Sequence, residues 1–463
     1  MKLKISVLVG LLILAGAGLW FWKEGWRNPW TFFFGGDTWA KTYGGPNNDE
    51  AKFILETPEG NYLVAGGTQS FGVGGEDAWI LQLDAKGQVV WQKTYGGSDT
   101  EEAFSIQKTA DPAGQGYIVG GRARGLGTGG MDAWVVKMDG RGQVAWQEVL
   151  GGADWDYAAI VRQTREGGYI AAGATGSSGA GYSDVWVLKL DARGQVVWQK
   201  TYGGTEWDYA ASLVQTPEGG YLVGGGTQSF GAGLMDAWVL KLDANGQVAW
   251  QKTYGEKRED RAYAVIPASD HGYIVAGSTA SFGAGGMDAW VFKLDEKGRV
   301  IWQKTYGGQQ EDRAYDIKPV GKRGYLLAGE TQSYGAGGVD VWVLKLDLNG
   351  RVEWQRVYGG DKVERAYSIQ ETAAGGYVLA GGTASFGAGK ADAWVLKTDG
   401  KGIISRDCPF GQITLAPSSA SAAKVTDTSV TPADSTATVT VTAVKPSPIT
   451  VAVQTQCPPE KAK

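Results

Sequence analysis

Residues 236–255 read Asp-Ala-Trp-Val-Leu-Lys-Leu-Asp-Ala-Asn-Gly-Gln-Val-Ala-Trp-Gln-Lys-Thr-Tyr-Gly. Two runs rich in Val, Leu, Trp and Tyr flank the tetrad that begins at Asp243 and ends at Gly246. An Asp that accepts local backbone hydrogen bonds and a Gly that takes positive φ are typical of a hairpin turn. The stretch therefore predicts two antiparallel strands joined by a tight turn.

The same pattern recurs along most of the chain. The triplet Asp-Ala-Trp or Asp-Val-Trp is spaced by 55 residues once and then by 52 residues five times. Its seven copies begin at Asp77, Asp132, Asp184, Asp236, Asp288, Asp340 and Asp392. A fixed period near 50 residues is typical of a propeller or a solenoid.

Each repeat predicts four short strands, and the ends of the repeat array distinguish between these two architectures. The last repeat lacks the Trp-Gln-Lys-Thr-Tyr strand, while a matching Trp-Ala-Lys-Thr-Tyr begins at Trp39. A strand at residues 38–43 would complete the last blade and leave no open edge in the ring. The sequence thus predicts an all-β, seven-bladed β-propeller over residues 38–405, with four antiparallel strands per blade.

The N-terminal residues predict export. A basic start is followed by eighteen uncharged residues, Ile5–Trp22, which as a helix would be about 27 Å long. Residues 1–23 are therefore interpreted either as a cleaved signal peptide or as a signal anchor, and residues 24–37 as a linker. Both alternatives place the protein outside the cytoplasm, either anchored to the membrane by its N-terminus or secreted.

The C-terminal residues 406–463 form a tail rich in Ser, Thr, Ala and Pro. This tail contains both cysteines of the chain, Cys408 and Cys457. In an exported protein such a pair is most simply one disulfide. Two interpretations of the tail stay open: a flexible stalk, or an extended strand that the disulfide holds against the propeller.

The repeats resemble two propeller families. Gly doublets such as Gly225-Gly226 resemble kelch repeats, and residues 242–250 resemble quinoprotein-type repeats. The pattern Trp-Gln-Lys-Thr-Tyr-Gly-Gly with Gly-Gly-Tyr-Ile-Val-Ala-Gly is similar to that of exported prokaryotic propeller proteins, most of them uncharacterised. The resemblance implies the fold, whereas propellers host many unrelated activities.

Composition argues against several classes of function. The chain has 73 Gly, one His and a formal net charge of −5 without a basic block, so we expect no nucleic-acid partner. The one histidine, His271, stands where most repeats have a turn Gly, and we interpret it as a solvated turn residue. Quinoprotein dehydrogenases, which the repeats resemble, usually have eight blades and a calcium-binding set of acidic residues, whereas this sequence has seven repeats. We therefore expect neither catalysis nor a cofactor.

Two sets of acidic residues recur once per blade. One is the Asp that opens the third strand in every repeat, from Asp77 to Asp392. The other consists of Asp49, Glu101, Asp156, Asp208, Asp260, Asp312 and Glu364. Both sets are predicted on one face. They suit either a calcium site, for which the third-strand aspartates are weak candidates, or the capping of loops, which we favour.

Two tryptophans depart from the repeat. Trp155 and Trp207 stand at equivalent loop positions where the other repeats have Asn, Thr, Glu or Val, and each is followed by Asp-Tyr. Exposed aromatic residues beside carboxylates suit stacking on a sugar ring or anchoring a peptide. We therefore predict ligand contacts from Trp155, Tyr157, Trp207 and Tyr209. The alternative is that each Trp covers the neighbouring loop.

Together these features favour a non-enzymatic, monomeric propeller that serves as a binding or scaffold module for a protein or glycan outside the cytoplasm. The alternatives are a lectin-like surface protein that binds glycans, a purely structural role in an envelope assembly, and a quinoprotein-like oxidoreductase.

Overall fold

The structure is a computed structural model that describes residues 38–111 and 114–404 and seven short backbone strands between residues 411 and 457. Side chains are described for residues 38–110 and 116–404. The predicted signal segment and linker, Cys408, and the side chain of Cys457 lie outside the described residues. Within the described part of the chain, no helix is long and apolar enough to cross a membrane.

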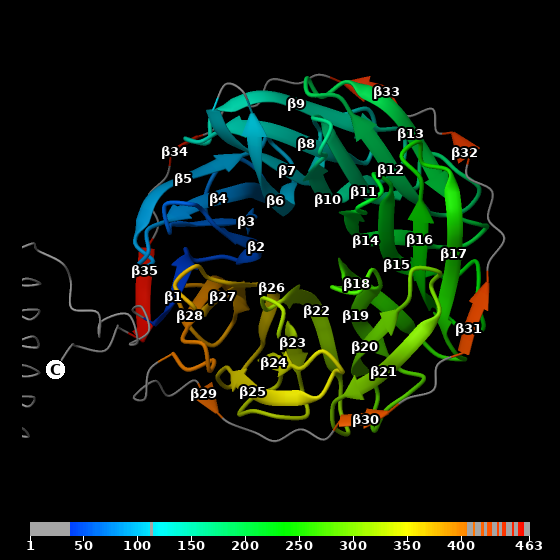
Figure 1. Ribbon diagram of the computed structural model, residues 1–463. Coiled ribbons are helices and arrows are strands. Elements are labelled where there is room, and N and C mark those ends of the chain that lie inside the picture. The colour runs from blue at the N-terminus through cyan, green and yellow to red at the C-terminus, as the bar shows by residue number, and fades with distance from the viewer. Residues whose placement is uncertain are drawn as a thin grey trace, which may run out of the picture. The chain divides into compact units, whose positions relative to one another are not determined.

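Seven antiparallel sheets surround a central axis, as predicted (Figure 1). The first strands of blades 1 to 7 are β2 (Asp49–Glu56), β6 (Glu101–Asp111), β10 (Asp156–Gln163), β14 (Asp208–Gln215), β18 (Asp260–Pro267), β22 (Asp312–Pro319) and β26 (Glu364–Glu371). The second strands are β3 (Tyr62–Thr68), β7 (Gly114–Arg124), β11 (Tyr169–Thr175), β15 (Tyr221–Thr227), β19 (Tyr273–Thr279), β23 (Tyr325–Thr331) and β27 (Tyr377–Thr383).

The third and fourth strands complete each blade toward the outside of the ring. The third strands are β4 (Asp77–Leu83), β8 (Met131–Asp139), β12 (Asp184–Leu190), β16 (Asp236–Leu242), β20 (Asp288–Leu294), β24 (Asp340–Leu346) and β28 (Asp392–Thr398). The fourth strands of blades 1 to 6 are β5 (Val89–Tyr95), β9 (Val144–Gly151), β13 (Val196–Tyr202), β17 (Val248–Gly255), β21 (Val300–Tyr306) and β25 (Val352–Tyr358). Blade 7 takes its fourth strand, β1 (Trp39–Gly44), from the N-terminal side of the ring.

The predicted turn between third and fourth strands has the expected chemistry. Asp243 Oδ1 accepts hydrogen bonds from the backbone N–H groups of Asn245 and Gln247, both at 2.8 Å, and Gly246 has a φ of 73°. The Gly246 carbonyl in turn accepts a 2.7 Å hydrogen bond from the Tyr202 hydroxyl of the preceding blade. The turn and the fourth-strand Tyr thus recur together because they join neighbouring blades.

The ring closes as predicted. Strand β1 pairs with β28, with Trp39 opposite Lys397 and Tyr43 opposite Ala393. The Tyr43 hydroxyl then donates a 2.8 Å hydrogen bond to the Gly87 carbonyl of blade 1, as other fourth-strand tyrosines do to the blade that follows. The N-terminal strand therefore belongs to blade 7 by pairing and contacts blade 1 through its side chain.

The tail adds a fifth strand to every blade, where the sequence interpretation offered a single extended strand held against the propeller. These strands are β29 (Gly411–Gln412), β30 (Ser418–Ala420), β31 (Lys424–Asp427), β32 (Ala433–Asp434), β33 (Thr438–Thr440), β34 (Ser447–Pro448) and β35 (Ala452–Cys457). Each lies on the outer edge of one blade (Figure 1). This pairing corresponds to the extended-strand interpretation of the tail. The disulfide stays a prediction.

The core lies between adjacent blades. Each third-strand Trp is almost completely buried, and Trp290 of blade 5 packs with Leu222 and Val239 of blade 4 and Val275 of its own blade. Because large aromatic side chains bury much apolar area, each interface contributes strongly to stability. His271 is exposed with a φ of 68° between the first and second strands of blade 5, so its interpretation as a turn residue is confirmed.

Candidate functional site

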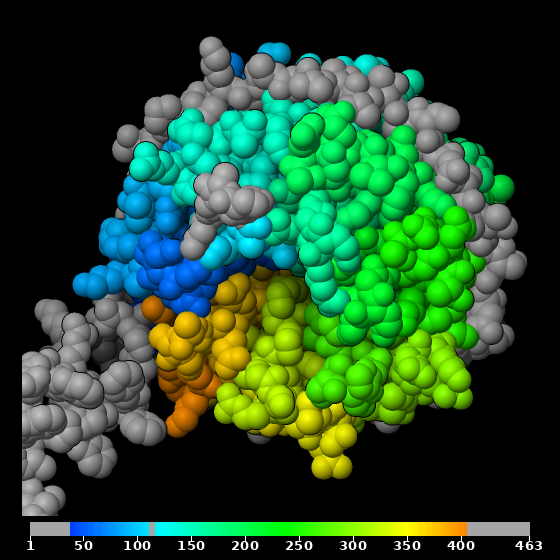
Figure 2. Space-filling view, turned by 45° about the horizontal axis from the view of Figure 1, so that its top comes forward, coloured from blue at the N-terminus to red at the C-terminus, as the bar shows by residue number. Residues whose placement is uncertain are grey.

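The loop before each third strand meets the loop before the next blade's first strand. Isolated parallel bridges join Ser183 to Trp207 and Met235 to Glu259, and four other blade pairs have an equivalent bridge, so six of the seven pairs have one. Both sets of loops therefore lie on one face, as predicted. Figure 2 shows the colours of successive blades gathered around a central depression.

Residues from the innermost strands face this central opening. The second residue of each first strand is partly exposed in every blade except blade 2, where Glu102 is 7% exposed, and the residues on either side of it are buried. In blade order these residues are Glu50, Glu102, Tyr157, Tyr209, Arg261, Arg313 and Arg365. The opening therefore has an acidic, an aromatic and a basic sector.

The two predicted tryptophans meet in the aromatic sector. The rings of Trp155 and Trp207 stack with centroids 5.3 Å apart and 16° between their planes. Tyr157 also stacks with Trp155, at 5.8 Å and 12°, and Tyr182 stacks with Trp207 at 6.4 Å and 15°. We call this row of Tyr157, Trp155, Trp207 and Tyr182 the aromatic column.

The column combines both interpretations of the tryptophans. Trp155 stacks with both Tyr157 and Trp207, so part of its role is to cover neighbouring loop residues. Trp207 is nevertheless 42% exposed and Tyr182 64% exposed. Ring edges and the end of the column are therefore open to solvent, where a ligand could contact them.

Sequence reasoning missed Tyr182. It stands two residues before the third-strand aspartate Asp184, a position that is Gly in four of the other repeats. The remaining two repeats have Leu234 and Lys390 there. Tyr182 is therefore a further departure from the repeat on the same face, and the comparison of loop positions that singles out Trp155 and Trp207 also identifies it.

A pocket of about 420 Å³ lies beside the column. It is lined by Trp155, Tyr157, Ser183, Trp207, Asp208, Tyr209, Gln228, Met235 and Arg261. All four predicted ligand contacts therefore border one cavity, which we call the aromatic pocket. Its lining joins apolar rings to amide, hydroxyl and guanidinium groups, the mixture typical of small-ligand and anchor-residue sites.

Gly226 positions Tyr209 in this pocket. A Cβ added to Gly226 would lie 2.8 Å from Tyr209 Cε1, so the ring packs directly against the glycine. Burial raises the pKa of Tyr209 well above its usual value, which keeps its hydroxyl protonated and able to donate at neutral pH. Arg261, on the next blade, forms a 3.1 Å ion pair with Glu259.

The basic sector is neutralised by buried and exposed glutamates. Glu330 is 1% exposed by its side chain and accepts hydrogen bonds of 2.5 Å from both Arg313 and Arg365. Arg313 also bonds Glu311. Farther along the opening, Phe53 of blade 1 lies within 6 Å of the charged groups of Arg162 and Lys318, from blades 3 and 6. Side chains thus meet across the opening.

The two predicted sets of acids pair across every blade interface. A Cβ added to Gly151 would lie 2.2 Å from Asp132 Oδ1 and 2.6 Å from Asp156 Oδ2, which places both carboxylates beside that glycine. Burial and, to a lesser extent, the nearby charge of Asp156 raise the pKa of Asp132 to about 6. Burial also raises the pKa of Asp77, Asp236 and Asp288 to about 6.

These acids cap loops. Asp156 Oδ2 accepts hydrogen bonds from the Gly152 N–H at 2.9 Å and from the Ser177 hydroxyl at 2.7 Å. Asp184 Oδ2 accepts from two N–H groups of the loop before it. Within the described residues no group of three or more His, Cys, Asp or Glu side chains is arranged to hold a metal ion. Two carboxylates per interface suit capping better than calcium, which takes about six to eight oxygens.

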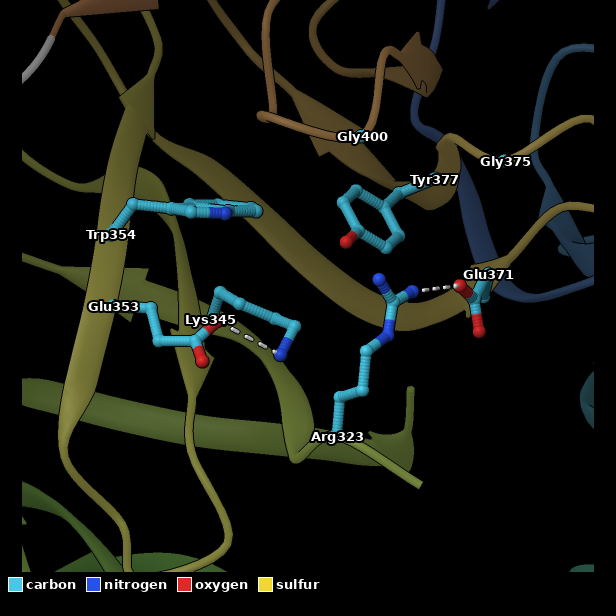
Figure 3. Close-up of a pocket in the computed structure, with 8 residues that line it drawn as sticks. All are labelled: Arg323, Lys345, Glu353, Trp354, Glu371, Gly375, Tyr377 and Gly400. Carbon is cyan, nitrogen blue, oxygen red and sulfur yellow. Dashed lines mark hydrogen bonds and ion pairs between the residues drawn. The ribbon is translucent and has the colours of Figure 1, made fainter. Parts of the chain in front are cut away.

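A second pocket of about 360 Å³ lies between blades 6 and 7 (Figure 3). Trp354 and Tyr377 face each other there, with ring centroids 5.8 Å apart. The two cations of this pocket are already paired, Lys345 with Glu353 at 3.2 Å and Arg323 with Glu371 at 3.7 Å. Trp–Tyr pairs of this kind recur at other blade interfaces, so this pocket follows from the repeat.

Comparisons with known proteins give limited information. No family model matches the chain, so the kelch-like and quinoprotein-like resemblance has no match beyond the seven-bladed propeller itself. The regulatory protein FlaEY of Caulobacter vibrioides is 26% identical over 162 residues. That match covers 30% of this chain and 17% of FlaEY, so the chain spans less than a fifth of that relative.

Solved structures are similar at low identity. Sqt1 from Chaetomium thermophilum has a TM-score of 0.43 at 12% identity, covering 77% of this chain and 98% of that one. The endo-1,5-alpha-L-arabinanase of Thermotoga petrophila RKU-1 has a TM-score of 0.29 at 10% identity, covering 77% and 99%. Trypanosoma rangeli sialidase has 0.30 at 8%, covering 76% and 54%. These values assign no family.

Proposed function

We propose that this protein is a non-enzymatic binding module that works outside the cytoplasm and holds a protein or glycan ligand at the aromatic pocket between blades 3 and 4. The observation that carries the proposal is the aromatic column. Four rings from three loops and one strand stack on one another, although the repeats of the other five blades have no Trp at the equivalent loop position.

Burial and polarity support binding at this place. Trp207 and Tyr182 expose large ring areas, and exposed aromatic residues on a rigid scaffold form favourable contacts without much loss of side-chain entropy. Gln228 is exposed at the rim of the pocket, and Arg261 adds N–H donors. Apolar rings beside such donors suit a sugar, which has apolar ring faces and hydroxyl groups, or an anchoring side chain of a protein.

Glycan and protein ligands differ in what they require of the column. A sugar stacks on a free ring face, and Tyr182 offers one at the end of the column. A protein anchor fills the pocket itself and so depends on Tyr209 and Met235. Loss of binding in Tyr182→Ala alone favours a glycan, whereas loss in Tyr209→Ala with binding retained in Tyr182→Ala favours a protein.

The test uses full-length protein purified with its native N-terminus. Glycan arrays and in vivo crosslinking are compared for wild type, for Trp155→Ala with Trp207→Ala, and for Val363→Ala. Val363 occupies the same repeat position as the tryptophans on blade 7 and is 36% exposed, so it is the matched control. Unchanged glycan binding and unchanged crosslinked partners in the double variant would overturn the proposal.

Location and catalysis need separate measurements. Fractionation and mass spectrometry of the mature N-terminus test export and cleavage within residues 1–23. A bound quinone cofactor, or cofactor-dependent substrate oxidation by the purified protein, would favour the quinoprotein-like alternative over binding.

A further inference from the structure

The C-terminal strands follow the ring in a fixed order. We call residues 411–457 the strap. Strand β29 pairs with β25 of blade 6, and β30 to β34 pair with the fourth strands of blades 5, 4, 3, 2 and 1 in turn. Strand β35 then pairs with β1 of blade 7. The strap thus visits each blade once, in the order opposite to the repeats (Figure 1).

The register of these pairs advances by seven residues per blade. Five strap residues lie opposite the fourth-strand Tyr or, in blade 2, the equivalent Leu. The pairs are Gly411 with Tyr358, Ser418 with Tyr306, Val425 with Tyr254, Val439 with Leu150, and Val453 with Tyr43. In blades 3 and 1 the first pairs are Ala433 with Thr201 and Ser447 with Thr94, which is the same register.

The amino-acid sequence of the strap has the same period. Counting from Gly411, the sixth residue of each group of seven is Ala or Val in six successive groups. These residues are Ala416, Ala423, Val430, Ala437, Val444 and Val451. A seven-residue repeat in the sequence and a seven-residue step in the pairing are independent observations, and both match one strap unit to one blade.

The circuit begins and ends at the same blade. The chain leaves blade 7 after β28 and the turn that ends at Gly402, and Ile404 is still buried there. It returns to blade 7 as β35, where Cys457 lies opposite Ala40. Cys457 follows Cys408 by 49 residues, which is seven steps of seven. One complete circuit of seven blades therefore separates the two cysteines.

We propose that the strap encircles the propeller and is closed by a disulfide between Cys408 and Cys457. Ile404, four residues before Cys408 in the sequence, belongs to the same buried cluster as Ala40, which is the pairing partner of Cys457. Bond formation joins the two sulfur atoms and removes two protons and two electrons. An external protein disulfide of the thiol–disulfide exchange type accepts them and becomes a dithiol. This step requires an oxidising compartment, as the proposed export supplies.

A closed strap has two physical consequences, neither of which depends on what the aromatic pocket binds. It occupies the outer backbone edge of every blade, the edge that would otherwise template pairing with another chain. It also places β1 between β28 and β35, so the strand that closes the ring is held from both sides. Opening the ring at β1 then also requires the strap to move, because β35 pairs with β1 and the proposed disulfide ties its end to Cys408 after β28.

The first experiment maps the bond in full-length protein purified under oxidising conditions. Alkylation of free thiols followed by non-reducing peptide mapping is expected to recover Cys408 linked to Cys457. A variant lacking residues 425–431 loses one step of seven and ends one blade short, so its intramolecular disulfide should be lost. Replacing the same seven residues with a Gly-Ser heptapeptide is the length control and should retain the bond.

The second experiment measures backbone hydrogen exchange in the fourth strands. Removing residues 405–463 should accelerate exchange in these strands about tenfold or more. Cys457→Ser keeps the strap but frees its ends, so exchange should rise more in β1 and β25, at the ends, than in β13 and β17, at the middle. This second variant keeps the test decisive if the truncated chain does not fold.

The proposal is overturned by free thiols in the oxidised protein, by an equally formed disulfide in the heptad deletion, or by unchanged exchange in the truncated chain. Equal acceleration in all fourth strands of Cys457→Ser would contradict the closed strap as well, because fraying from two ends cannot be uniform.

Discussion

Trp155 and Trp207 are 52 residues apart in the sequence, belong to loops of successive blades, and stack with ring centroids 5.3 Å apart. Residues separated by one repeat of 52 residues therefore lie within stacking distance, because the loops of adjacent blades converge toward the central opening. The same aromatic residue at two equivalent loop positions thus forms a contact between blades that neither repeat could form alone.

Trp207→Ala should remove the stacking contacts of Trp207 with Trp155 and with Tyr182. We expect a loss of about 1 kcal/mol in the free energy of unfolding, since aromatic pairs contribute about 0.5–1.5 kcal/mol each and Trp207 is partly exposed. The near-UV circular dichroism of the stacked indoles should also weaken. Urea unfolding and circular dichroism check this, with Val363→Ala expected within about 0.5 kcal/mol of wild type.

Gly226→Ala should displace Tyr209 from the aromatic pocket, because the new methyl group would lie 2.8 Å from its ring. Overpacking of this kind costs about 1–3 kcal/mol. Ligand binding at the pocket should weaken with it. The control is Gly382→Ala at the equivalent position of blade 7, where the nearest atom belongs to the flexible side chain of Glu50 at 3.2 Å. Equal effects of the two variants on binding would contradict the placement of Tyr209.

The acid pairs between blades should make the protein more stable at pH 5 than at pH 8. Burial raises the pKa of Asp77, Asp132, Asp236 and Asp288 to about 6 in the folded protein, above the usual value of 3.8. The folded state therefore binds these protons more tightly than the unfolded state. Their stabilising contribution is complete below about pH 4 and is lost as the pH rises through about 6.

Differential scanning calorimetry between pH 4.5 and pH 8 checks this dependence. Asp132→Asn should flatten it, because one titrating member of a pair is removed, whereas Asp243→Asn in a hairpin turn should keep the full slope. A melting temperature that rises steadily with pH in the wild-type protein would show that the acid pairs do not govern its stability.

Glu330→Gln should destabilise the ring more than Glu311→Gln does. Both glutamates bond Arg313, but Glu330 is buried and also bonds Arg365, whereas the side chain of Glu311 is 46% exposed. Loss of the buried carboxylate leaves two guanidinium groups undercompensated and should cost about 1–3 kcal/mol. The exposed pair should cost less than about 1 kcal/mol. Chemical unfolding of both variants gives the comparison, and equal losses would contradict it.

The sequence alone determined the blades and their closure. The Asp-x-x-Gly turn at Asp243 acts over four residues, and the fourth-strand Trp recurs in every blade and the fourth-strand Tyr in every blade except blade 2. Such short-range chemistry is visible as a repeated pattern. The displaced strand at Trp39 could be predicted from the sequence because the last repeat lacks a fourth strand and a matching strand stands before the first repeat.

Only the tertiary structure decided which departures from the repeat act together. Tyr182 and Trp207 are 25 residues apart and become neighbours because ring closure brings the loop before one third strand against the loop of the next blade. The strap was hidden for another reason. Its strands pair through backbone hydrogen bonds, which do not depend on particular side chains. The seven-residue period therefore became meaningful only when the structure showed that each group of seven residues reaches the next blade.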